Sequence, residues 1–380
     1  MIKCNFVDSI IRIDSDVWNS LVDDKFPFMQ YDFLYALEIS GCVSAKSGWK
    51  PHHLIVSNGD NIIAVMPLYL KYHSYGEYIF DFSWARAYEQ YGIDYYPKLL
   101  SAIPFVPASG VRLAYSNSVD TQEVFKLVSE SLRALSVENG YSSIHILLSD
   151  GRESNIWNAS GFKRKINTQF HWFNDNYETF DHFLETFNSR KRKAVRKERA
   201  SISQYEIDVE VKVGKEITSD LWDIFFNFYR DTYQKRSGHN GYLNREFFRS
   251  LSDLILAQTM VVFAKRGTEY IAGALYFFSD TTLYGRHWGC IENIEMLHFE
   301  LCYYSGIEFC IKHGLQKFEA GAQGEHKIQR GFIPNEVYSN HWVLDARFQN
   351  AINQNILEES NANLRYIEEM KAFLPFKKEY

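Results

Sequence analysis

The chain has 380 residues, of which 46% are hydrophobic and 23% charged, and its formal net charge is −6. This length predicts two domains or two similar halves, and the charge gives no overall attraction for nucleic acid. The five cysteines form no closely spaced pair, so we expect reduced thiols and no metal site. The sequence shows no signal-peptide pattern and no apolar run of about 18 residues, which predicts a cytoplasmic protein.

Strand and helix patterns alternate in the first half of the chain. Apolar runs at residues 53–56 and 62–72 flank Ser57-Asn58-Gly59-Asp60, and this combination predicts a hairpin. The other elements predicted in this half are a strand at 2–10, helices at 18–21, 33–38 and 121–137, and strands at 141–148 and 168–172.

The second half repeats this order. A hairpin is predicted at residues 260–265 and 270–278, around the turn Arg266-Gly267. The other predicted elements are a basic helix at 180–200, a strand at 206–213, aromatic-rich helices within 221–256, strands at 282–288 and 317–320, a helix at 297–313, a strand that ends in His341-Trp342, and an amphipathic C-terminal helix. The alternation predicts an α/β (α+β) fold with mixed sheets flanked by helices.

Short residue matches indicate an internal duplication. Gly161-Phe162 and His171-Trp172 have the same spacing as Gly331-Phe332 and His341-Trp342. Three further pairs match at a nearly constant offset: Ile63-Ala64 with Ile271-Ala272, Tyr75-Gly76 with Tyr284-Gly285, and Tyr95-Tyr96 with Tyr303-Tyr304. We therefore predict similar halves at 1–172 and 173–345, the second of them catalytic, and a C-terminal helix at 346–380.

The densest group of reactive side chains follows the strand at 317–320. Gly321 and Gly324 allow a ligand to approach the backbone closely there. Acyl transfer to an amine requires a base that takes the ammonium proton, so Glu325 and His326 are candidate catalytic residues. The candidate substrate-binding residues of this segment are Glu319, Gln323, Lys327 and Arg330. The alternative is a polar turn whose charges are solvated.

Two neighbouring segments add candidates. In a regular strand Arg286 and His287 point to opposite faces, so we expect one of them to face the substrate, with Arg286 favoured for an anion. On the next helix Glu300, Tyr304 and Glu308 share one face, at i, i+4 and i+8. Glu300 is a third candidate catalytic residue and Tyr304 a candidate substrate contact, while an exposed helix face is the alternative.

The last candidates lie in an aromatic stretch and a basic stretch. Tyr75, Asp81 and Trp84 are candidates for a substrate-recognition wall, or for a polar-capped core. The run 190–199 has seven basic residues and one acidic residue, and an anionic partner such as tRNA or a lipid phosphate would relieve its like-charge crowding. Its candidate anion-binding residues are Arg190, Lys191, Arg192, Lys193 and Arg196. A solvated helix is the alternative.

Six long strings of the sequence carry a resemblance to a known family. They are HSYGEYIFDFSWARAYEQYG, YYPKLLSAIPFVPASG, NSRKRKAVRKER, LYGRHWG, LHFELCYYSGIEFCI and FEAGAQGEHKIQRGFIP. They resemble the FemAB-like family of GNAT-type N-acyltransferases, which are also described as peptidoglycan biosynthesis or recognition proteins. The resemblance covers about residues 49–341 and implies two tandem GNAT-like halves.

The resemblance implies transfer of an acyl or aminoacyl group to an amine of a small molecule or a cell-wall precursor. Related Fem-type peptidyltransferases use aminoacyl-tRNA, so we expect aminoacyl-tRNA or acyl-CoA as the donor and no tightly bound cofactor. CoA-dependent GNAT enzymes hold the pyrophosphate in a glycine-rich loop, whereas residues 288–298 contain one glycine and two glutamates. This favours a donor other than CoA. A CoA-dependent N-acetyltransferase and a non-catalytic recognition module are the alternatives.

Overall fold

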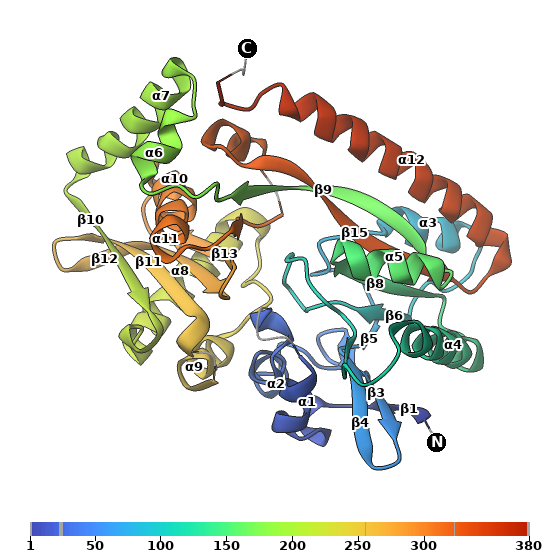
Figure 1. Ribbon diagram of the computed structural model, residues 1–380. Coiled ribbons are helices and arrows are strands. Elements are labelled where there is room, and N and C mark those ends of the chain that lie inside the picture. Colours follow the sequence, from blue (N-terminus) through green and yellow to red (C-terminus); the bar gives the residue numbers. More distant parts are fainter. Residues whose placement is uncertain (1, 23–25, 255, 323, 378–380) are drawn as a thin grey trace. The chain divides into compact units, whose positions relative to one another are not determined.

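The computed structural model describes residues 2–22, 26–254, 256–322 and 324–377 (Figure 1). The predicted α/β fold, with mixed sheets flanked by helices, is confirmed. The chain divides into a first unit, Met1–Thr168 with Glu336–Tyr366, and a second unit, Gln169–Asn335 with Ile367–Tyr380.

These units differ from the predicted halves chiefly in residues 336–366, which belong to the first unit; residues 169–172 and 367–380 belong to the second. Phe348, Ile352 and Ile356 pack with Trp84 and Tyr88 in one apolar cluster of the first unit. Burial of this apolar surface holds most of the C-terminal helix on the first unit, although it follows the second unit in sequence.

The first unit contains a small antiparallel sheet, β1-β3-β4-β7, and a larger run of strands in the order β15-β8-β6-β5-β2. The hairpin predicted from the turn at Gly59 is confirmed as β3 and β4. The strands are β1 (Ile2–Val7), β2 (Trp49–Pro51), β3 (His53–Asn58), β4 (Asn61–Met66), β5 (Tyr69–Lys71), β6 (Lys98–Ser101), β7 (Ala114–Tyr115), β8 (Ser143–Ser149) and, in part, β15 (Ile333–Val343).

Helix α4 shows how the first unit builds its core. Its apolar face, with Phe125, Val128 and Leu132, packs in one cluster with strand residues Ile144 and Ile146. The helices of this unit are α1 (Ser15–Leu21), α2 (Tyr31–Ile39), α3 (Phe82–Gln90), α4 (Thr121–Asn139), α5 (Gly151–Ala159) and most of α12 (Ala346–Lys371). Helices α3 and α5 were not predicted.

The second unit is built on one mixed sheet in the order β10-β11-β12-β13-β14-β9. The predicted hairpin is confirmed as β11 and β12, and only β13 and β14 pair in parallel among the printed pairs of this sheet. The strands are β9 (Lys163–Phe173, which begins in the first unit), β10 (Ile207–Val213), β11 (Thr259–Arg266), β12 (Glu269–Phe278), β13 (Thr282–Cys290) and β14 (Lys317–Glu319).

The predicted basic helix at 180–200 is two helices. The side chain of Asn188 accepts a hydrogen bond from the Lys191 N–H and so caps a new helix there. The helices of the second unit are α6 (Phe180–Glu185), α7 (Ser189–Ala200), α8 (Ser219–Ser237), α9 (Arg245–Leu254), α10 (Leu297–Phe299), the π-helix η6 (Glu300–Tyr304), α11 (Ser305–His313) and the 3₁₀ helix η7 (Glu325–Arg330). No helix in the described part of the chain is long and apolar enough to cross a membrane.

Helix α8 lies directly on β13, and one glycine permits this approach. A Cβ atom at Gly289 would lie 2.1 Å from the backbone oxygen of Phe228. Because a main-chain oxygen cannot move aside as a side chain can, Gly289 fixes the spacing between helix and sheet.

Replacing Gly289 by Ala is therefore expected to destabilise the protein by about 3 kcal/mol. The matched control is Gly267→Ala in the β11–β12 turn, where φ is +57° and no atom lies within 4 Å of the added Cβ. The control variant is expected to lose only about 1 kcal/mol of stability, which is the strain of a left-handed backbone at a residue with a Cβ atom. Urea unfolding of both variants checks this, and equal losses would show that α8 can shift.

Candidate functional site

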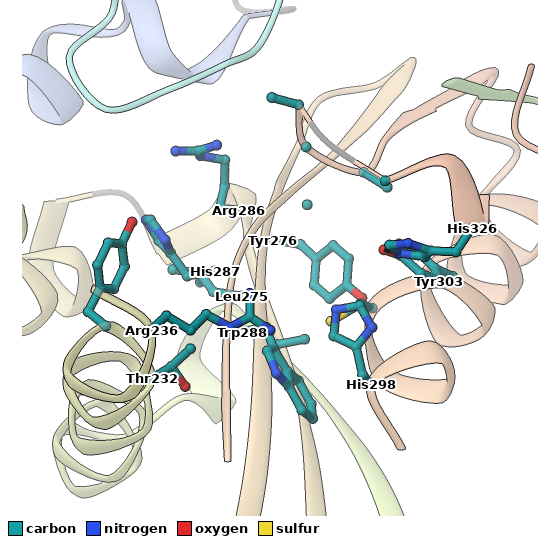
Figure 2. Close-up of a pocket in the computed structure, with 18 of the residues that line it drawn as sticks. Thr232, Arg236, Leu275, Tyr276, Arg286, His287, Trp288, His298, Tyr303 and His326 are labelled. Atoms are coloured by element: carbon teal, nitrogen blue, oxygen red, sulfur yellow. Dashed lines mark hydrogen bonds between the residues drawn. The ribbon is translucent and has the colours of Figure 1, made fainter. Parts of the chain in front are cut away.

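A pocket of about 520 Å³ opens in the second unit where two parallel strands separate (Figure 2). β13 and β14 pair from Thr282–Lys317 to Tyr284–Glu319. Beyond this point the pocket is lined by residues 285–288 of β13 and by residues 320–322 and 324, which follow β14. Residues 274–276 of β12, helix α8, the helix that begins at Leu297, and His326 of η7 supply the remaining walls.

Arg286 and His287 both line the pocket, although a regular strand would separate them. Opposite them on β12, Leu275 pairs with His287 and Tyr276 pairs with Gly285, so Arg286 is an extra residue in β13. Such a β-bulge interrupts the alternation of side chains. The prediction that only one of these two residues faces the site was wrong, because it assumed a regular strand. The His287 ring lies edge-on to the Tyr229 ring, with 4.9 Å between centroids.

The π-helix η6 brings Tyr303 into the pocket. Its bond from the Ser305 N–H to the Glu300 carbonyl spans five residues, one more than in an α-helix. A turn of this width returns residue i+5 over residue i, so Tyr303 lies over His298, with 5.3 Å between their ring centroids. Sequence reasoning missed both side chains, because it treated this segment as a regular α-helix.

Tyr303 and His326 form a hydrogen-bonded pair in the pocket wall (Figure 2). The Tyr303 hydroxyl lies 2.7 Å from His326 Nε2. Burial raises the pKa of Tyr303, so the hydroxyl stays protonated, and it donates to His326 Nε2 when the imidazole carries its proton on Nδ1. Burial, with the nearby Arg330 and Lys327, lowers the pKa of His326. At neutral pH this imidazole is therefore an unprotonated base.

Gly324 allows His326 to take this position. Its φ is +115°, and a Cβ atom there would lie 2.5 Å from the His326 ring. Only glycine adopts such a backbone conformation readily and leaves that space open. Gly324, which the sequence analysis predicted to let a ligand approach the backbone, thus leaves space for the ring of His326.

The pocket is electropositive. Among the described residues that line it are Arg236, Arg286 and three histidines, and none of them is Asp or Glu. Burial, together with His326 and Arg236, lowers the pKa of His298 to about 3, so this ring is neutral. A pocket lined by cations and lacking carboxylates favours a ligand with an anionic group.

Comparisons with known proteins agree with this architecture. A family model described as FemAB-like, peptidoglycan biosynthesis/recognition, matches residues 9–378. The chain belongs to the FemAB-like family. A comparison with curated proteins gave no sequence match.

The solved structures similar to this FemAB-like protein share its fold at low identity. The C-terminal domain of a putative lysylphosphatidylglycerol synthetase from Agrobacterium fabrum matches with a TM-score of 0.54 and 8% identity, over 93% of this chain and 97% of that one. FemX matches with a TM-score of 0.52 and 12% identity, over 83% and 93% of the two chains. L-PGS from Bacillus licheniformis matches with a TM-score of 0.51 and 10% identity, over 86% and 95%.

Several predicted site residues of the FemAB-like chain lie outside the lining of this pocket. Lys327 is buried and donates to the Gly321 carbonyl at 2.7 Å, and burial lowers its pKa to about 7. Glu319 is buried and forms an ion pair with Lys317 at 2.7 Å, while Glu325 is exposed. Gln323 lies outside the described residues. Lys327 therefore contacts the backbone of the pocket loop, and of the predicted bases only His326 lines the pocket.

Glu300, Tyr304 and Glu308 share one helix face, as predicted, but this face contacts α7. Arg199 donates to Glu300 at 2.7 Å and to Glu308 at 2.6 Å, and the Tyr304 hydroxyl donates to Glu198. Burial raises the pKa of Glu300, although Arg199 opposes this. The helix period identified the face, but the sequence did not reveal which neighbour it contacts.

The basic residues predicted to bind an anion lie on α7. Arg190, Lys193 and Arg196 are exposed, and Arg196 pairs with Asp181 at 2.8 Å. Lys191, which donates to Gln329, and Arg192 are half-buried. Helix α7 thus presents several cations to solvent.

Two of the three residues predicted in the first unit are buried there. Asp81 accepts from Lys98 at 2.5 Å and from the Tyr95 hydroxyl at 2.6 Å, and Lys98 also donates to Glu77 at 2.9 Å. Trp84 donates to Asn355 at 2.8 Å, whereas Tyr75 is exposed. The polar-capped core, which was the alternative to a substrate wall, describes Asp81 and Trp84.

The five cysteines are free thiols, as expected. No three His, Cys, Asp or Glu side chains of the described residues form a group that could hold a metal ion.

Lys98 is expected to be essential for the stability of the first unit. Burial alone would lower its pKa, but Asp81 and Glu77 raise it, so the ammonium is charged. Lys98→Met removes the only cation in hydrogen-bond contact with Asp81 and Glu77 among the described residues and leaves Glu77 the more distant Lys71, at 3.9 Å, so it is expected to cost about 4 kcal/mol in the free energy of unfolding. The triple variant Lys98→Met/Asp81→Asn/Glu77→Gln should recover part of this loss. Urea unfolding measures both, and a single variant as stable as the parent would contradict the prediction.

Proposed function

We propose that this FemAB-like protein is an N-acyltransferase that moves an aminoacyl group from tRNA to an amine of a cell-wall precursor, with the reaction in the pocket of the second unit. The observation that supports it best is the Tyr303–His326 pair, a proton donor and a neutral base in hydrogen-bond contact beside a cationic pocket. The description of the family as peptidoglycan biosynthesis/recognition suggests the acceptor. The cytoplasmic location expected from the sequence fits a tRNA donor and stays a prediction.

The pair can move the protons that the reaction requires. As the amine nitrogen bonds to the acyl carbon, its proton passes to the Tyr303 oxygen while the Tyr303 proton passes to His326 Nε2. As the bond from the acyl carbon to the donor oxygen breaks, Tyr303 protonates that oxygen and His326 returns its proton to Tyr303. The amine has then lost one proton, the leaving group has gained it, and both side chains have returned to their starting state.

The charges favour a polyanionic donor. Arg286 and Arg236 would hold a phosphate near the reacting ester, while the exposed cations of α7 would contact an RNA backbone. The segment before α10 carries Glu292, which pairs with Arg266 at 2.8 Å, and the exposed Glu295. GNAT enzymes hold the pyrophosphate of CoA at this position. The two carboxylates would repel that pyrophosphate here.

His326 and Tyr303 are expected to control the rate of transfer. His326→Gln and Tyr303→Phe should each lower kcat about 100-fold or more, because each breaks the proton path. In the parent, kcat/KM should rise with pH along an acid limb below pH 6.5, because a base with a lowered pKa becomes neutral there. That limb should disappear in His326→Gln. The control is His313→Gln, an exposed residue of α11; unchanged rates in the pocket variants would contradict the proposed roles.

The donor can be identified by offering two labelled candidates together with a cell-wall precursor extract. Transfer of ¹⁴C-amino acids from charged bulk tRNA is expected, with loss of tRNA binding in Arg190→Glu/Lys193→Glu. Binding of the parent should weaken steeply with salt because neutralised phosphates release counterions. Transfer of ¹⁴C-acetyl from acetyl-CoA instead would establish the CoA-dependent alternative. Tight binding of the precursor without any transfer would establish a recognition module.

A further inference from the structure

Two adjacent residues near the end of α7 contact both ends of the π-helix η6. Arg199 donates to Glu300 at 2.7 and 3.0 Å, and Glu198 accepts from the Tyr304 hydroxyl. Glu300 and Tyr304 are the first and last residues of η6, and Tyr303 precedes Tyr304 directly. The basic helix therefore holds the turn that carries the proton donor.

Glu198 also reaches the base, through Arg330. Arg330 Nη2 donates to Glu198 at 2.8 Å, and its Nη1 donates to the His326 carbonyl oxygen at 2.7 Å. The Arg330 guanidinium lies 3.4 Å from the centroid of the Phe299 ring, which contacts the rings of Tyr303 and His326 at 5.9 and 5.5 Å. We refer to Glu198, Arg199, Glu300, Tyr304 and Arg330 as the α7 bridge.

The central pair of the α7 bridge is largely shielded from water. The Arg330 side chain is 7% exposed and the Glu198 side chain 22%. A charge-assisted hydrogen bond in such surroundings is stronger and more fixed in geometry than a surface ion pair. Glu198 is also the only acidic residue of α7. A carboxylate at this position neutralises the buried cation Arg330, which lies behind the pocket residue His326, whereas the other charged residues of the helix are basic.

We propose that Glu198 is a positioning residue: through Arg330 and Tyr304 it sets the distance between His326 and Tyr303, and it couples anion binding on α7 to the geometry of the pocket. This inference rests on the proposed function, because it connects the surface that would hold the donor RNA with the site that would react with its ester. Coupling of this kind is reciprocal, so a ligand in the pocket would change the affinity of α7 for the anion by the same factor.

Several charged and titratable groups surround His326. Glu325, Lys327 and Arg330 lie on its own helix, and His298 and Tyr303 lie on the helix packed against it. Of these, Arg330 and Lys327 lower the pKa of His326. Replacing Arg330 by Met should therefore raise this pKa toward its ordinary value of about 6.5, besides loosening the base.

The first test measures the His326 imidazole by NMR in protein labelled at histidine, with bulk deacylated tRNA as the probe and no turnover. Saturating tRNA should shift the His326 resonances of the parent and of the remote control Glu269→Gln. In Glu198→Gln, which keeps the shape of the side chain, the shift should be lost while tRNA still binds. A shift that persists in Glu198→Gln, or no shift in the parent under saturating tRNA, would overturn the coupling.

The second test is kinetic. Glu198→Gln should lower kcat about 10-fold or more with KM near the parent value, because a small misplacement of the pair slows the chemical step. The remote control Glu269→Gln should keep the parent kcat, and thermal melting should show that all variants are folded. An unchanged kcat in folded Glu198→Gln would overturn the positioning role. Absence of transfer in the parent would refute the proposed function instead, and the His326 resonances of Glu198→Gln compared with those of the parent, both without tRNA, would still decide the positioning role.

Discussion

The point where β13 and β14 stop pairing determines the geometry of the second unit. The three paired residues of each strand end at Tyr284 and Glu319, and the pocket begins with the next residue of each strand. Close packing holds the paired part together: a Cβ atom at Gly306 of α11 would lie 2.6 Å from the Phe318 ring. On one side of this point the strands are held by the close apolar contact of Gly306 with Phe318, and on the other side polar residues line the pocket. The close packing gives the pocket a rigid floor.

The cations around this floor have different surroundings, and burial explains the difference. Arg330 is buried and forms an ion pair with Glu198, and the half-buried Arg199 forms ion pairs with Glu300 and Glu308, because a charge removed from water requires a partner. Arg236 is exposed at the pocket rim, where water solvates it. The same residue type therefore stabilises the wall in one place and supplies positive potential in the other.

The sequence predicted those elements whose signal is local. Both hairpins were predicted because turn residues lie between two apolar runs. The helix α5 was missed although Asp150 and Glu153 form a cap pattern at its start.

In the site, His326, Arg286 and His287 were found from composition and position. Tyr303 was not found as a site residue, because its direction depends on the π-helix, and Arg330 was assigned to substrate because its buried partner Glu198 lies 132 residues away. A bulge, a π turn and a distant ion pair leave no periodic trace in a sequence.

The residue matches between the two halves differ in what they preserve. Ile63-Ala64 and Ile271-Ala272 lie in equivalent hairpin strands, β4 and β12, and the two GF turns each precede a long strand, β9 and β15. In contrast, Tyr284-Gly285 lies in β13 and Tyr303-Tyr304 in the π-helix, whereas their first-half counterparts lie between β5 and β6 outside regular structure. The predicted matches therefore lie in equivalent elements where the residues build the fold, and in different elements where the second unit builds its pocket. In the first unit, the Tyr95 hydroxyl donates to the buried carboxylate of Asp81 and also lies 3.2 Å from Nε2 of His145, an imidazole buried in the core. In the second unit, the hydroxyl of the matching Tyr303 contacts an imidazole at the pocket, which is the arrangement a proton transfer needs.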